Sequence, residues 1–459
     1  MNKKLLFILT CVIVVGISSC GEHFLSVKPD RSIRTPQSIE DYQALLDHAT
    51  LMNAPSCHEL GVIGGDESYL LDGRWANLSQ PYQRNAYVWA ANVYEGQPVD
   101  DWDGAYQRIL QANMALEGVL SIAPSAEERP AWNNIKGSAL FFRAWNHYQL
   151  AQLFCDVYDA TKAVTQLGIP LRLESDVTVT AKRATVEQTY RSILDDLHEA
   201  ADLLPVSPVH KFRPSKGATY ALLCRVYLQM EDYEAAAKYG ELCLHTFGAL
   251  VDYNELDFSG SYTFTSDYGM SNAEVLFMNR LPAPTIMNST RQNIDTTLLA
   301  MYAVGDLRQF AYFRMHTNGS IIFKGSYSGG SSFFTGLAID EVYISLAESY
   351  ARVGELGKAR EYTKELLAHR YAKETLAPIE TVSDNGLIAF ILTERRKELV
   401  FRGTRWEDLR RLNKKPETAV NLTRKIDGLE FELPAGDPFW VWPIPDNVID
   451  RSGMEQNKR

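Results

Sequence analysis

The side chains best suited to binding a sugar gather between residues 53 and 100. This stretch supplies aromatic rings together with acidic, basic and amide groups, namely Asp66, Tyr69, Arg74, Trp75, Tyr82, Tyr87, Trp89, Asn92 and Tyr94. Sugars present flat C–H faces edged by hydroxyl groups, so their binding sites combine aromatic rings with groups that donate and accept hydrogen bonds. The composition of this stretch is therefore suited to a ligand-binding surface.

A second region, residues 250–335, has the same character. It is rich in Gly, Ser, Asn and aromatic residues, as in the run from Tyr327 to Phe334. Loops of this length in a compact protein are usually either functional or disordered, and their aromatic content argues against disorder. From this region we expect Tyr268 and Tyr327 to act as opposing aromatic rings in the ligand site.

Each of these side chains also has a purely structural interpretation. Large aromatic rings are more often packed in a core or beneath a loop than in contact with a ligand. Asp66 follows Gly64 and Gly65, and its carboxylate could cap a helix or a turn. The sequence alone leaves both interpretations open.

No pattern in the sequence marks a catalytic or metal centre. A glycoside hydrolase would need two carboxylates facing each other across a cleft, and no motif marks such a pair. We interpret Asp101 and Asp103 as structural. The nine histidines are scattered without HExxH or similar spacing, and no CxxC pair occurs. We therefore expect a protein that is not an enzyme and that uses no metal and no cofactor.

The elements that must carry these loops are mostly helical, and no Pro/Gly/Ser-rich linker divides the chain. Two segments match the tetratricopeptide pattern, in which small residues let two antiparallel helices approach while Tyr and Leu fill the adjacent gap. They are Cys224, Tyr227, Tyr233, Ala236 and then Ala347, Tyr350, Leu356, Ala359, with Gly354 at the second turn. The two matches are not in tandem. Weaker candidates for helix pairs are 102–118 with 137–154, and 187–204 running into 214–228.

The N-terminus has the composition of an export signal. Lys3 and Lys4 precede the apolar run 5–17, which is too short to cross a bilayer because a spanning helix needs about 20 apolar residues. Small residues then lead to Cys20, as in a bacterial lipobox, where the cysteine is lipidated. Ordinary signal cleavage beside an incidental cysteine is the alternative. We expect residues 1–19 to be removed and residues 20–459 to form a single domain.

Charge and cysteine usage narrow the possible partners. The chain has 46 basic and 57 acidic residues, and removal of Lys3 and Lys4 leaves 44 basic residues and a net charge of −13. This balance, with no long basic run, argues against nucleic acid as a partner.

Besides Cys11 and Cys20, the chain contains Cys57, Cys155, Cys224 and Cys243. Cys224 and Cys243 could pair, but buried free thiols in helices are the favoured interpretation.

The C-terminal part contains a motif that resembles the SusD/RagB family. Residues 394–411 read ERRKELVFRGTRWEDLRR, in which an ER-x-x-EL helix leads through a Gly turn into an R-x-x-DL helix. Further matches are Pro443-Ile444-Pro445 followed by Gln456-Asn457, the WDGAYQRILQAN segment 102–113, and the segment 137–154. The resemblance runs from Cys20 to the end of the chain.

The motif itself is best explained as structural. Glu394 and Glu398 lie four residues apart and therefore share one helix face. Arg395, Arg405 and Asp408 offer partners for ion pairs that would fix two helices about a turn. We therefore expect the charged residues of the motif to hold the scaffold together rather than to bind a ligand.

The resemblance implies a fold and a function. The fold is mainly α, with four tetratricopeptide-like helix pairs forming a right-handed superhelical scaffold with long loop insertions and few short strands. The function is that of a cell-surface outer-membrane lipoprotein, without enzyme activity, that binds an oligosaccharide and delivers it to a SusC-like TonB-dependent transporter. Peptide ligands occur in other members. A tetratricopeptide scaffold that grips a peptide in its helical groove is the rival function.

The resemblance also singles out ligand-binding residues. Trp89-x-x-Asn92 preceded by Arg74 and Asp66 is similar to the arrangement in starch-binding relatives, where the Trp ring stacks on the sugar and the other three side chains bond its hydroxyls. The expected ligand-binding residues are thus Asp66, Arg74, Trp75, Trp89, Asn92, Tyr268 and Tyr327, in loops at about 53–100 and 250–335.

The proposed lipid anchor gives the first testable prediction. We expect Cys20→Ser to release the protein from the membrane fraction, because acyl chains hold a protein by burying methylene groups at about 0.8 kcal/mol each. Fractionation of cells that express each form measures this. A Cys20→Ser protein that stays in the membrane as firmly as the wild type would contradict the lipid anchor.

Overall fold

The computed structural model describes residues 36–180, 182–316, 319–375 and 378–459. Ser38–Arg459 forms one compact unit, which contains the elements below. The signal sequence and Cys20 lie outside the described residues. None of the described helices is both long and apolar enough to cross a membrane.

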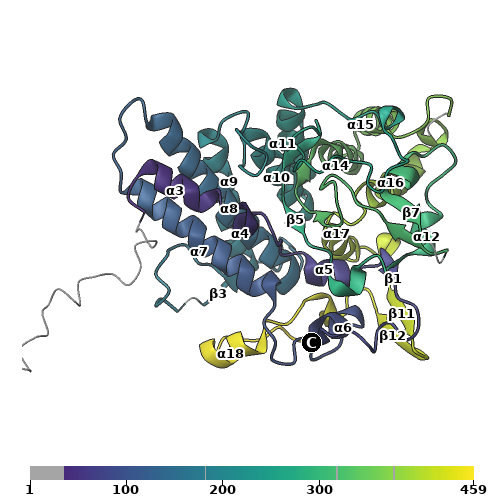
Figure 1. The fold of residues 1–459 in the computed structure, drawn as a ribbon, viewed down its shortest axis with the longest axis horizontal. Coiled ribbons are helices and arrows are strands. Elements are labelled where there is room, and N and C mark those ends of the chain that lie inside the picture. The colour runs from purple at the N-terminus through teal and green to yellow at the C-terminus, as the bar shows by residue number, and fades with distance from the viewer. Residues whose placement is uncertain (1–35, 181, 317–318, 376–377) are drawn as a thin grey trace, which may run out of the picture. The chain divides into compact units, whose positions relative to one another are not determined.

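Long antiparallel helices form the scaffold (Figure 1). In chain order they are α7 (Asp100–Leu120), α8 (Arg129–Phe154), α9 (Val186–Leu203), α10 (Lys216–Gln229), α11 (Tyr233–Thr246), α14 (Ile339–Arg352) and α15 (Leu356–Ala368). Each packs against the next, so that α7, α8, α9, α10, α11, α14 and α15 form one continuous array. This arrangement confirms the mainly α, tetratricopeptide-like fold.

Shorter helices and two-residue to five-residue strands surround this array. The helices are α3 (Ile39–Leu46), α4 (Ala49–Met52), α5 (Glu59–Gly64), α6 (Pro81–Tyr87), α12 (Thr296–Leu299), α13 (Arg308–Tyr312), α16 (Leu387–Glu398), α17 (Arg405–Leu412) and α18 (Asp446–Ser452). Short 3₁₀ helices lie at Tyr253–Glu255, Thr285–Met287, Pro378–Thr381, Asp384–Gly386, Pro416–Thr418 and Pro438–Trp440.

The described strands form two-stranded antiparallel sheets. The pairs are β1 (Ser68–Tyr69) with β6 (Asn293–Ile294), β2 (Leu167–Pro170) with β3 (Arg183–Thr185), β4 (Val275–Phe277) with β10 (Leu337–Ala338), β5 (Arg280–Leu281) with β9 (Phe333–Phe334), β7 (Phe313–Met315) with β8 (Ile321–Phe323), and β11 (Leu422–Ile426) with β12 (Leu429–Leu433). Several of these pairs join segments far apart in the sequence, and they fix the long loops to the scaffold.

Local sequence signals explain where the scaffold helices begin. Thr185 and Gln188 form a capping box at the start of α9, in which each side chain bonds the backbone N–H of the other. The Ser215 hydroxyl caps α10 by accepting from Ala218 N–H, and the Asp232 carboxylate caps α11 by accepting from Ala235 N–H. Each cap satisfies an N–H group that the helix itself leaves without a partner.

Both predicted tetratricopeptide pairs are present, as α10–α11 and α14–α15. The tyrosines at matching positions stack in the same way: the rings of Tyr227 and Tyr239 are 5.5 Å apart and nearly parallel, and those of Tyr350 and Tyr362 are 5.7 Å apart. The weaker candidates are also confirmed, since the pair 102–118 and 137–154 corresponds to α7–α8, and 187–204 with 214–228 to α9–α10.

The two matched pairs are neighbours in space although they are far apart in the sequence. α11 packs directly on α14, and at Gly240 an added Cβ atom would come within 2.8 Å of the Leu346 side chain. The residues between these helices therefore form an insertion that leaves the helical array unbroken. The non-tandem spacing of the two matches in the sequence therefore does not separate the helix pairs in space, because α11 contacts α14 directly.

The four cysteines that follow the signal sequence are free and buried, as the sequence analysis favoured. Burial raises the pKa of the Cys57, Cys155 and Cys224 thiols to about 12. These thiols are therefore protonated at neutral pH.

The charged motif at α16 and α17 holds the scaffold together. Arg395 Nε lies 2.7 Å from Asp408 Oδ2 and joins the two helices across the turn. Glu398 accepts from Arg308 at 2.9 Å and from Arg370 at 2.7 Å, and all three side chains are buried. Glu394 also pairs with Arg308, at 2.5 Å. The structural interpretation of the motif is confirmed.

The turn between α16 and α17 is fastened to the start of β1. Gly403 in this turn has a φ of +81°, and an added Cβ atom would lie 2.4 Å from the His58 ring. The Phe401 N–H donates to Glu67 Oε1 at 2.7 Å. Burial is the main cause that raises the pKa of Glu67 to about 7, and the nearby Asp66 carboxylate adds to it.

The buried cluster around Glu398 gives a prediction about stability. Glu398→Ala should lower the free energy of unfolding by about 3–5 kcal/mol, because it removes one carboxylate partner from each of two buried guanidinium groups, Arg308 and Arg370. Urea denaturation measures the change. The control is Lys425→Ala, which breaks an ion pair whose side chains are mostly exposed, and it should change stability by less than about 0.5 kcal/mol. Equal effects of the two variants would contradict the role of the cluster.

Glu67 gives a prediction about pH. Between about pH 4.5 and pH 7 the unfolded chain loses this proton while the native chain keeps it, so the native state loses stability as pH rises. Glu67→Gln removes this pH dependence. Between pH 5 and pH 8, the free energy of unfolding of the variant should therefore rise by about 2–3 kcal/mol relative to that of the wild type. Chemical denaturation of both proteins across this range measures the difference. A difference that stays constant with pH would show that Glu67 titrates normally.

Candidate functional site

Asp66 lies at the end of the segment that follows α5 and is held by two arginines. Its carboxylate accepts from Arg405 Nε at 2.7 Å and from Arg405 Nη2 at 2.8 Å, while Arg396 Nη2 lies 3.1 Å away. Although burial opposes ionisation, these guanidinium groups hold the pKa of Asp66 far below its usual range. Asp66 therefore fastens its loop to α17 and does not cap a turn.

Trp89 is buried, with 3% of its surface exposed. Its indole N–H donates to Gly64 O at 3.0 Å, and the guanidinium group of Arg424 lies over its ring at 5.3 Å. Its φ of +53° is uncommon for a residue other than glycine. The structure thus places Trp89 beneath the surface, where both its ring face and its N–H are occupied by the protein.

Arg74, Trp75 and Asn92 reach the surface. Arg74 is exposed, and its side chain makes no hydrogen bond or ion pair with the described part of the chain. Trp75 is half-buried, its indole N–H donates to Arg84 O at 2.9 Å, and its ring lies 5.8 Å from that of Phe431. Asn92 is exposed and accepts from the Glu95 N–H at 3.2 Å through Oδ1. These three side chains are accessible to a ligand.

Tyr268 and Tyr327 do not face each other as expected. Tyr268 is 44% exposed, and its ring lies beside Phe212 and Arg280. Tyr327 is fully buried, and its hydroxyl donates to Glu274 and lies 3.1 Å from Asp340 Oδ2. The expectation of opposing rings is wrong because Tyr327 is part of the buried polar interior beneath the loops.

The structure adds an element that the sequence analysis did not foresee, the β11–β12 hairpin. Asp427 and Gly428 at its tip both have positive φ, of 52° and 77°, which is the geometry of a two-residue hairpin turn. The hairpin packs its inner face on residues 63–89, and Arg424 on that face donates to Ser68 O and stacks on Tyr87. The Asp-Gly pair between two alternating apolar runs is the signal that could have revealed it.

Loop 71–75 and the hairpin are fastened to each other. The Asp427 N–H donates to Asp72 Oδ1 at 2.7 Å, and Asp427 Oδ1 in turn accepts from the Gly73 N–H. With the Trp75–Phe431 contact, these bonds fix two segments that lie far apart in the sequence as one surface. In Figure 1 the hairpin lies at the lower right, beside β1 and close to α6.

We call this surface the hairpin face and define it by exposed or half-buried apolar side chains with polar neighbours. Tyr69, Leu71 and Leu429 are 36%, 47% and 52% exposed. The full set is Tyr69, Leu71, Trp75, Leu429 and Phe431, with Asp72, Arg74 and Asp427 between them. Aromatic rings beside charged groups that donate and accept hydrogen bonds are a combination suited to sugar binding.

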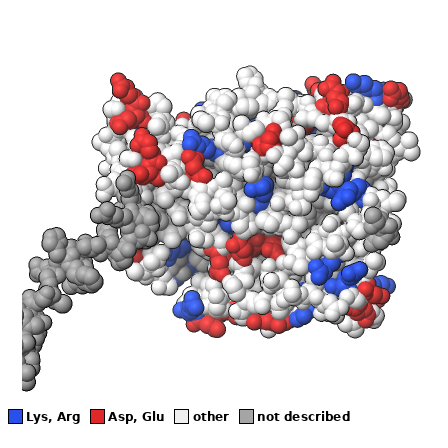
Figure 2. All heavy atoms as spheres, viewed as in Figure 1, with Lys and Arg blue, Asp and Glu red and all other residues white. Residues whose placement is uncertain are grey.

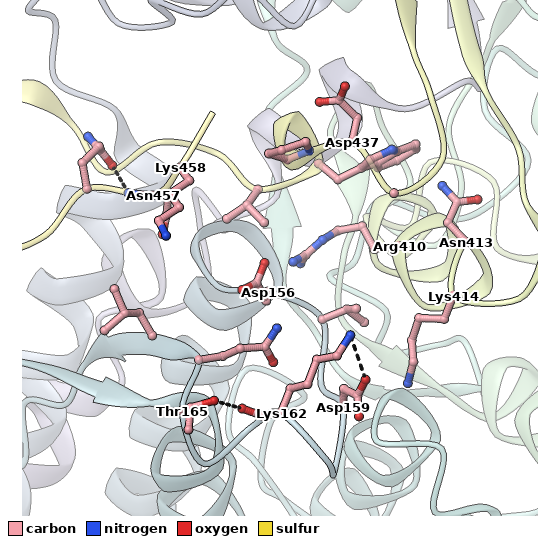
Figure 3. Close-up of a pocket in the computed structure, with 18 of the residues that line it drawn as sticks. Asp156, Asp159, Lys162, Thr165, Arg410, Asn413, Lys414, Asp437, Asn457 and Lys458 are labelled. Atoms are coloured by element: carbon pink, nitrogen blue, oxygen red, sulfur yellow. Dashed lines mark hydrogen bonds and ion pairs between the residues drawn. The ribbon is translucent and has the colours of Figure 1, made fainter.

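A separate cavity lies against the C-terminal tail (Figure 3). It has a volume of about 700 Å³ and is lined by the 156–167 loop, the end of α17, residues 436–441 and residues 455–458. Several of its polar groups are engaged in structure: Asn457 donates to Phe154 O and Trp442 O, and Lys414 pairs with Glu231. Arg410 donates to backbone oxygens at the end of α8. This cavity contains none of the expected ligand residues.

Comparison with known proteins agrees with this architecture. A family model described as "Starch-binding associating with outer membrane" matches residues 23–228, and the SusD family model matches residues 337–459. The chain is also 28% identical over 178 residues to SusD-like protein P2 of Formosa agariphila, a match that spans 36% of this chain and 33% of that relative's length.

Solved structures show the same fold. A SusD superfamily protein of Bacteroides thetaiotaomicron superposes with a TM-score of 0.73 at 21% identity, covering 92% of this chain and all of that one. A laminarin-binding SusD-like protein superposes with a TM-score of 0.63 at 17% identity, covering 93% and 99% of the two chains. We conclude that this chain belongs to the SusD family, on the basis of the matched family models, the ion-paired motif of α16 and α17 and the shared fold.

Proposed function

We propose that this protein binds an oligosaccharide at the cell surface and delivers it to a SusC-like TonB-dependent transporter in the outer membrane. The observation that supports this most strongly is its membership of the SusD family, one of whose matching models is described as starch-binding and associated with the outer membrane. The predicted lipidation of Cys20 would tether residues 20–459, as a single domain, to that membrane.

The hairpin face supports a binding role. It offers aromatic rings and the unpaired guanidinium group of Arg74, and its loops are fixed to each other before any ligand arrives. A surface that is already ordered loses little conformational entropy on binding. We propose that Arg74, Trp75 and Asn92 contact the sugar, that Tyr268 provides a more distant ring, and that Asp66, Trp89 and Tyr327 shape the surface from beneath.

We propose that the protein binds its ligand without transforming it. The two carboxylates of the hairpin face, Asp72 and Asp427, each accept a backbone N–H that joins the loop to the hairpin, which is a structural use of these groups. Incubation with polysaccharides followed by analysis of reducing ends tests this. Release of shorter products would overturn the non-catalytic proposal.

A peptide ligand bound to the helical array is the second candidate. The unbroken array of α7–α11, α14 and α15 favours it, because continuous helix pairs are the usual peptide-binding surface of tetratricopeptide proteins. Tyr362 on α15 is half-exposed on this array and lies outside the predicted ligand loops. Substitution of Tyr362 therefore distinguishes a glycan site on the loops from a peptide site on the helical array in a binding experiment.

The proposed site gives a prediction about affinity. Trp75→Ala and Arg74→Ala should each weaken binding to the preferred glycan about 5-fold to 10-fold, because one ring contact or charge-assisted hydrogen bond contributes about 1 kcal/mol. Calorimetry against a glycan panel and a peptide panel measures this. Tyr362→Ala is the matched control and should leave glycan affinity unchanged.

The two candidate functions predict different results in this experiment. Loss of peptide binding in Tyr362→Ala, with no glycan bound by any form, would favour the helical array as the site. Arg74→Ala controls for misfolding, because the exposed Arg74 side chain makes no hydrogen bond or ion pair with the described residues and its removal should leave the thermal midpoint unchanged. Trp89→Ala is less informative, since removal of a buried Trp costs about 3–5 kcal/mol of stability.

A further inference from the structure

A second group of aromatic side chains lies outside the hairpin face, around Tyr268. The rings of His210 and Phe212 stack with their centres 4.7 Å apart, and the Phe212 ring lies 5.1 Å from that of Tyr268. The guanidinium group of Arg280 lies 4.9 Å from the centre of the Tyr268 ring. We call these four side chains the Tyr268 cluster. Figure 1 shows β5, which carries Arg280, near the centre of the view and below α10.

Hydrogen bonds fix the segments that carry the Tyr268 cluster to one another. The buried Asn53 side chain donates to Phe212 O at 3.0 Å and to Met278 O at 2.8 Å. The Met278 N–H donates to Lys211 O at 2.7 Å. The Arg280 N–H donates to Asn53 O at 2.9 Å. The connection between α9 and α10 is therefore joined to the β4–β5 turn, and a surface that is already ordered loses little conformational entropy on binding.

Tyr268 lies at the tip of a tight turn. Its φ of +59° falls in the left-handed region, which is uncommon for a residue other than glycine, and Gly269 follows with a φ of +76°. Asp267 Oδ2 closes the turn by accepting from the Ser271 N–H at 2.8 Å. The Tyr268 side chain is 44% exposed, and its hydroxyl makes no hydrogen bond with the described part of the chain. Strained backbone of this kind clusters at sites that contact ligands.

Arg280 is a half-buried cation that no carboxylate balances. Its Nε is buried, and its guanidinium group makes no hydrogen bond or ion pair with any residue that the structure describes. The acid nearest in sequence to Tyr268, Asp267, lies close to another cation, Lys211. Burial lowers the pKa of the Lys211 ammonium group, and the Asp267 carboxylate opposes that change. Because partly buried donors without acceptors are costly, an anionic group is the chemistry that suits Arg280.

The overall charge of the protein does not favour anions. The formal net charge of the chain is −11. Figure 2 shows Lys and Arg as separate small groups, with no continuous basic area in this view. A field of this sign repels polyanions over the surface as a whole. Recognition of an anion therefore needs a local set of donors, and the guanidinium group of Arg280 with the hydroxyl of Tyr268 is such a set.

We infer that the Tyr268 cluster is a second ligand site, which binds a carboxylate or sulfate group carried by a sugar. Arg280 pairs with the anionic group, and the Tyr268 hydroxyl donates a hydrogen bond to it. The neighbouring rings of Phe212 and Tyr268 contact the apolar face of the sugar. The inference rests on the proposed glycan-binding function and adds to it a site apart from the hairpin face and the class of group that this site recognises.

The first test compares sugars that differ only in charge. The probes are oligogalacturonates with their methyl esters, and sulfated laminarin oligosaccharides with the unsulfated ones. Each is titrated calorimetrically into the full mature chain at about 0.15 M salt, where the Debye length of about 8 Å screens the net charge of the protein. We expect the acidic member of at least one pair to bind about tenfold more tightly, as for one charge-assisted hydrogen-bonded pair. Equal affinities within every pair would overturn the inference.

Two substitutions assign this preference to the Tyr268 cluster. Arg280→Gln should reduce the preference for the acidic sugar to less than about twofold and should leave affinity for the neutral sugar unchanged. Tyr268→Phe keeps the ring beside the guanidinium group and removes only the hydroxyl, so it should reduce the preference about threefold to fivefold. It provides the answer if Arg280→Gln lowers the thermal midpoint.

The matched control is Arg451→Gln on α18, at the lower left of Figure 1. Arg451 is exposed, and its substitution removes the same charge far from β5 in this view. The control should retain the preference for the acidic sugar. An equal loss in Arg451→Gln and Arg280→Gln would overturn the assignment, because net charge alone would then explain the preference.

Failure of the proposed function would give a different result. If neutral glycans bind, Trp75→Ala weakens them and no acidic sugar is preferred, the hairpin face stands and the inference about the Tyr268 cluster is overturned. If no glycan of either kind binds, the proposed function fails and the inference fails with it. If only peptides with a free carboxylate bind, and Arg280→Gln abolishes that binding, the cluster is a peptide site and both glycan proposals are overturned.

Discussion

The buried ion pairs between α16, α17 and the loops are the interaction on which the rest of this structure depends. Arg308 and Arg370 each reach Glu398, and Arg370 continues to Glu274, so that an insertion and the helical array meet at shared charges. Burying an isolated charge costs several kcal/mol, and these groups avoid that cost only in this one arrangement. The network therefore fixes where the insertion must lie on the scaffold.

The same principle extends from the network to the ligand loops. Arg405 of α17 holds Asp66, and the turn before α17 holds Glu67, so the start of the 66–95 segment is positioned by the motif of the scaffold. The hairpin then covers this segment, with Arg424 stacked on Tyr87 and bonded to Ser68 O. Two rigid attachments thus leave loop 71–75 at the surface in a defined place.

The helical part of this fold could be predicted from sequence because its signals are local. Cys224, Tyr227 and Ala236 specify a helix pair through spacing alone, and Gly354 marks the next turn. The motif at α16 and α17 could also be interpreted, since Arg395 and Asp408 lie close in the sequence. The ion pairs of Asp66 could not be predicted, because Arg405 lies 339 residues away and no local pattern links the two segments.

The candidate site could be predicted only in part, because residue type does not determine depth. Trp75 and Trp89 are equally suited to stack on a sugar, yet Arg424 covers Trp89 while Trp75 stays at the edge of the hairpin. That difference depends on a hairpin more than 330 residues further along the chain, as the separation between Arg424 and Tyr87 shows. The ring that a ligand can reach is therefore decided by tertiary packing, and the hairpin that hides one tryptophan is also what holds the other in place.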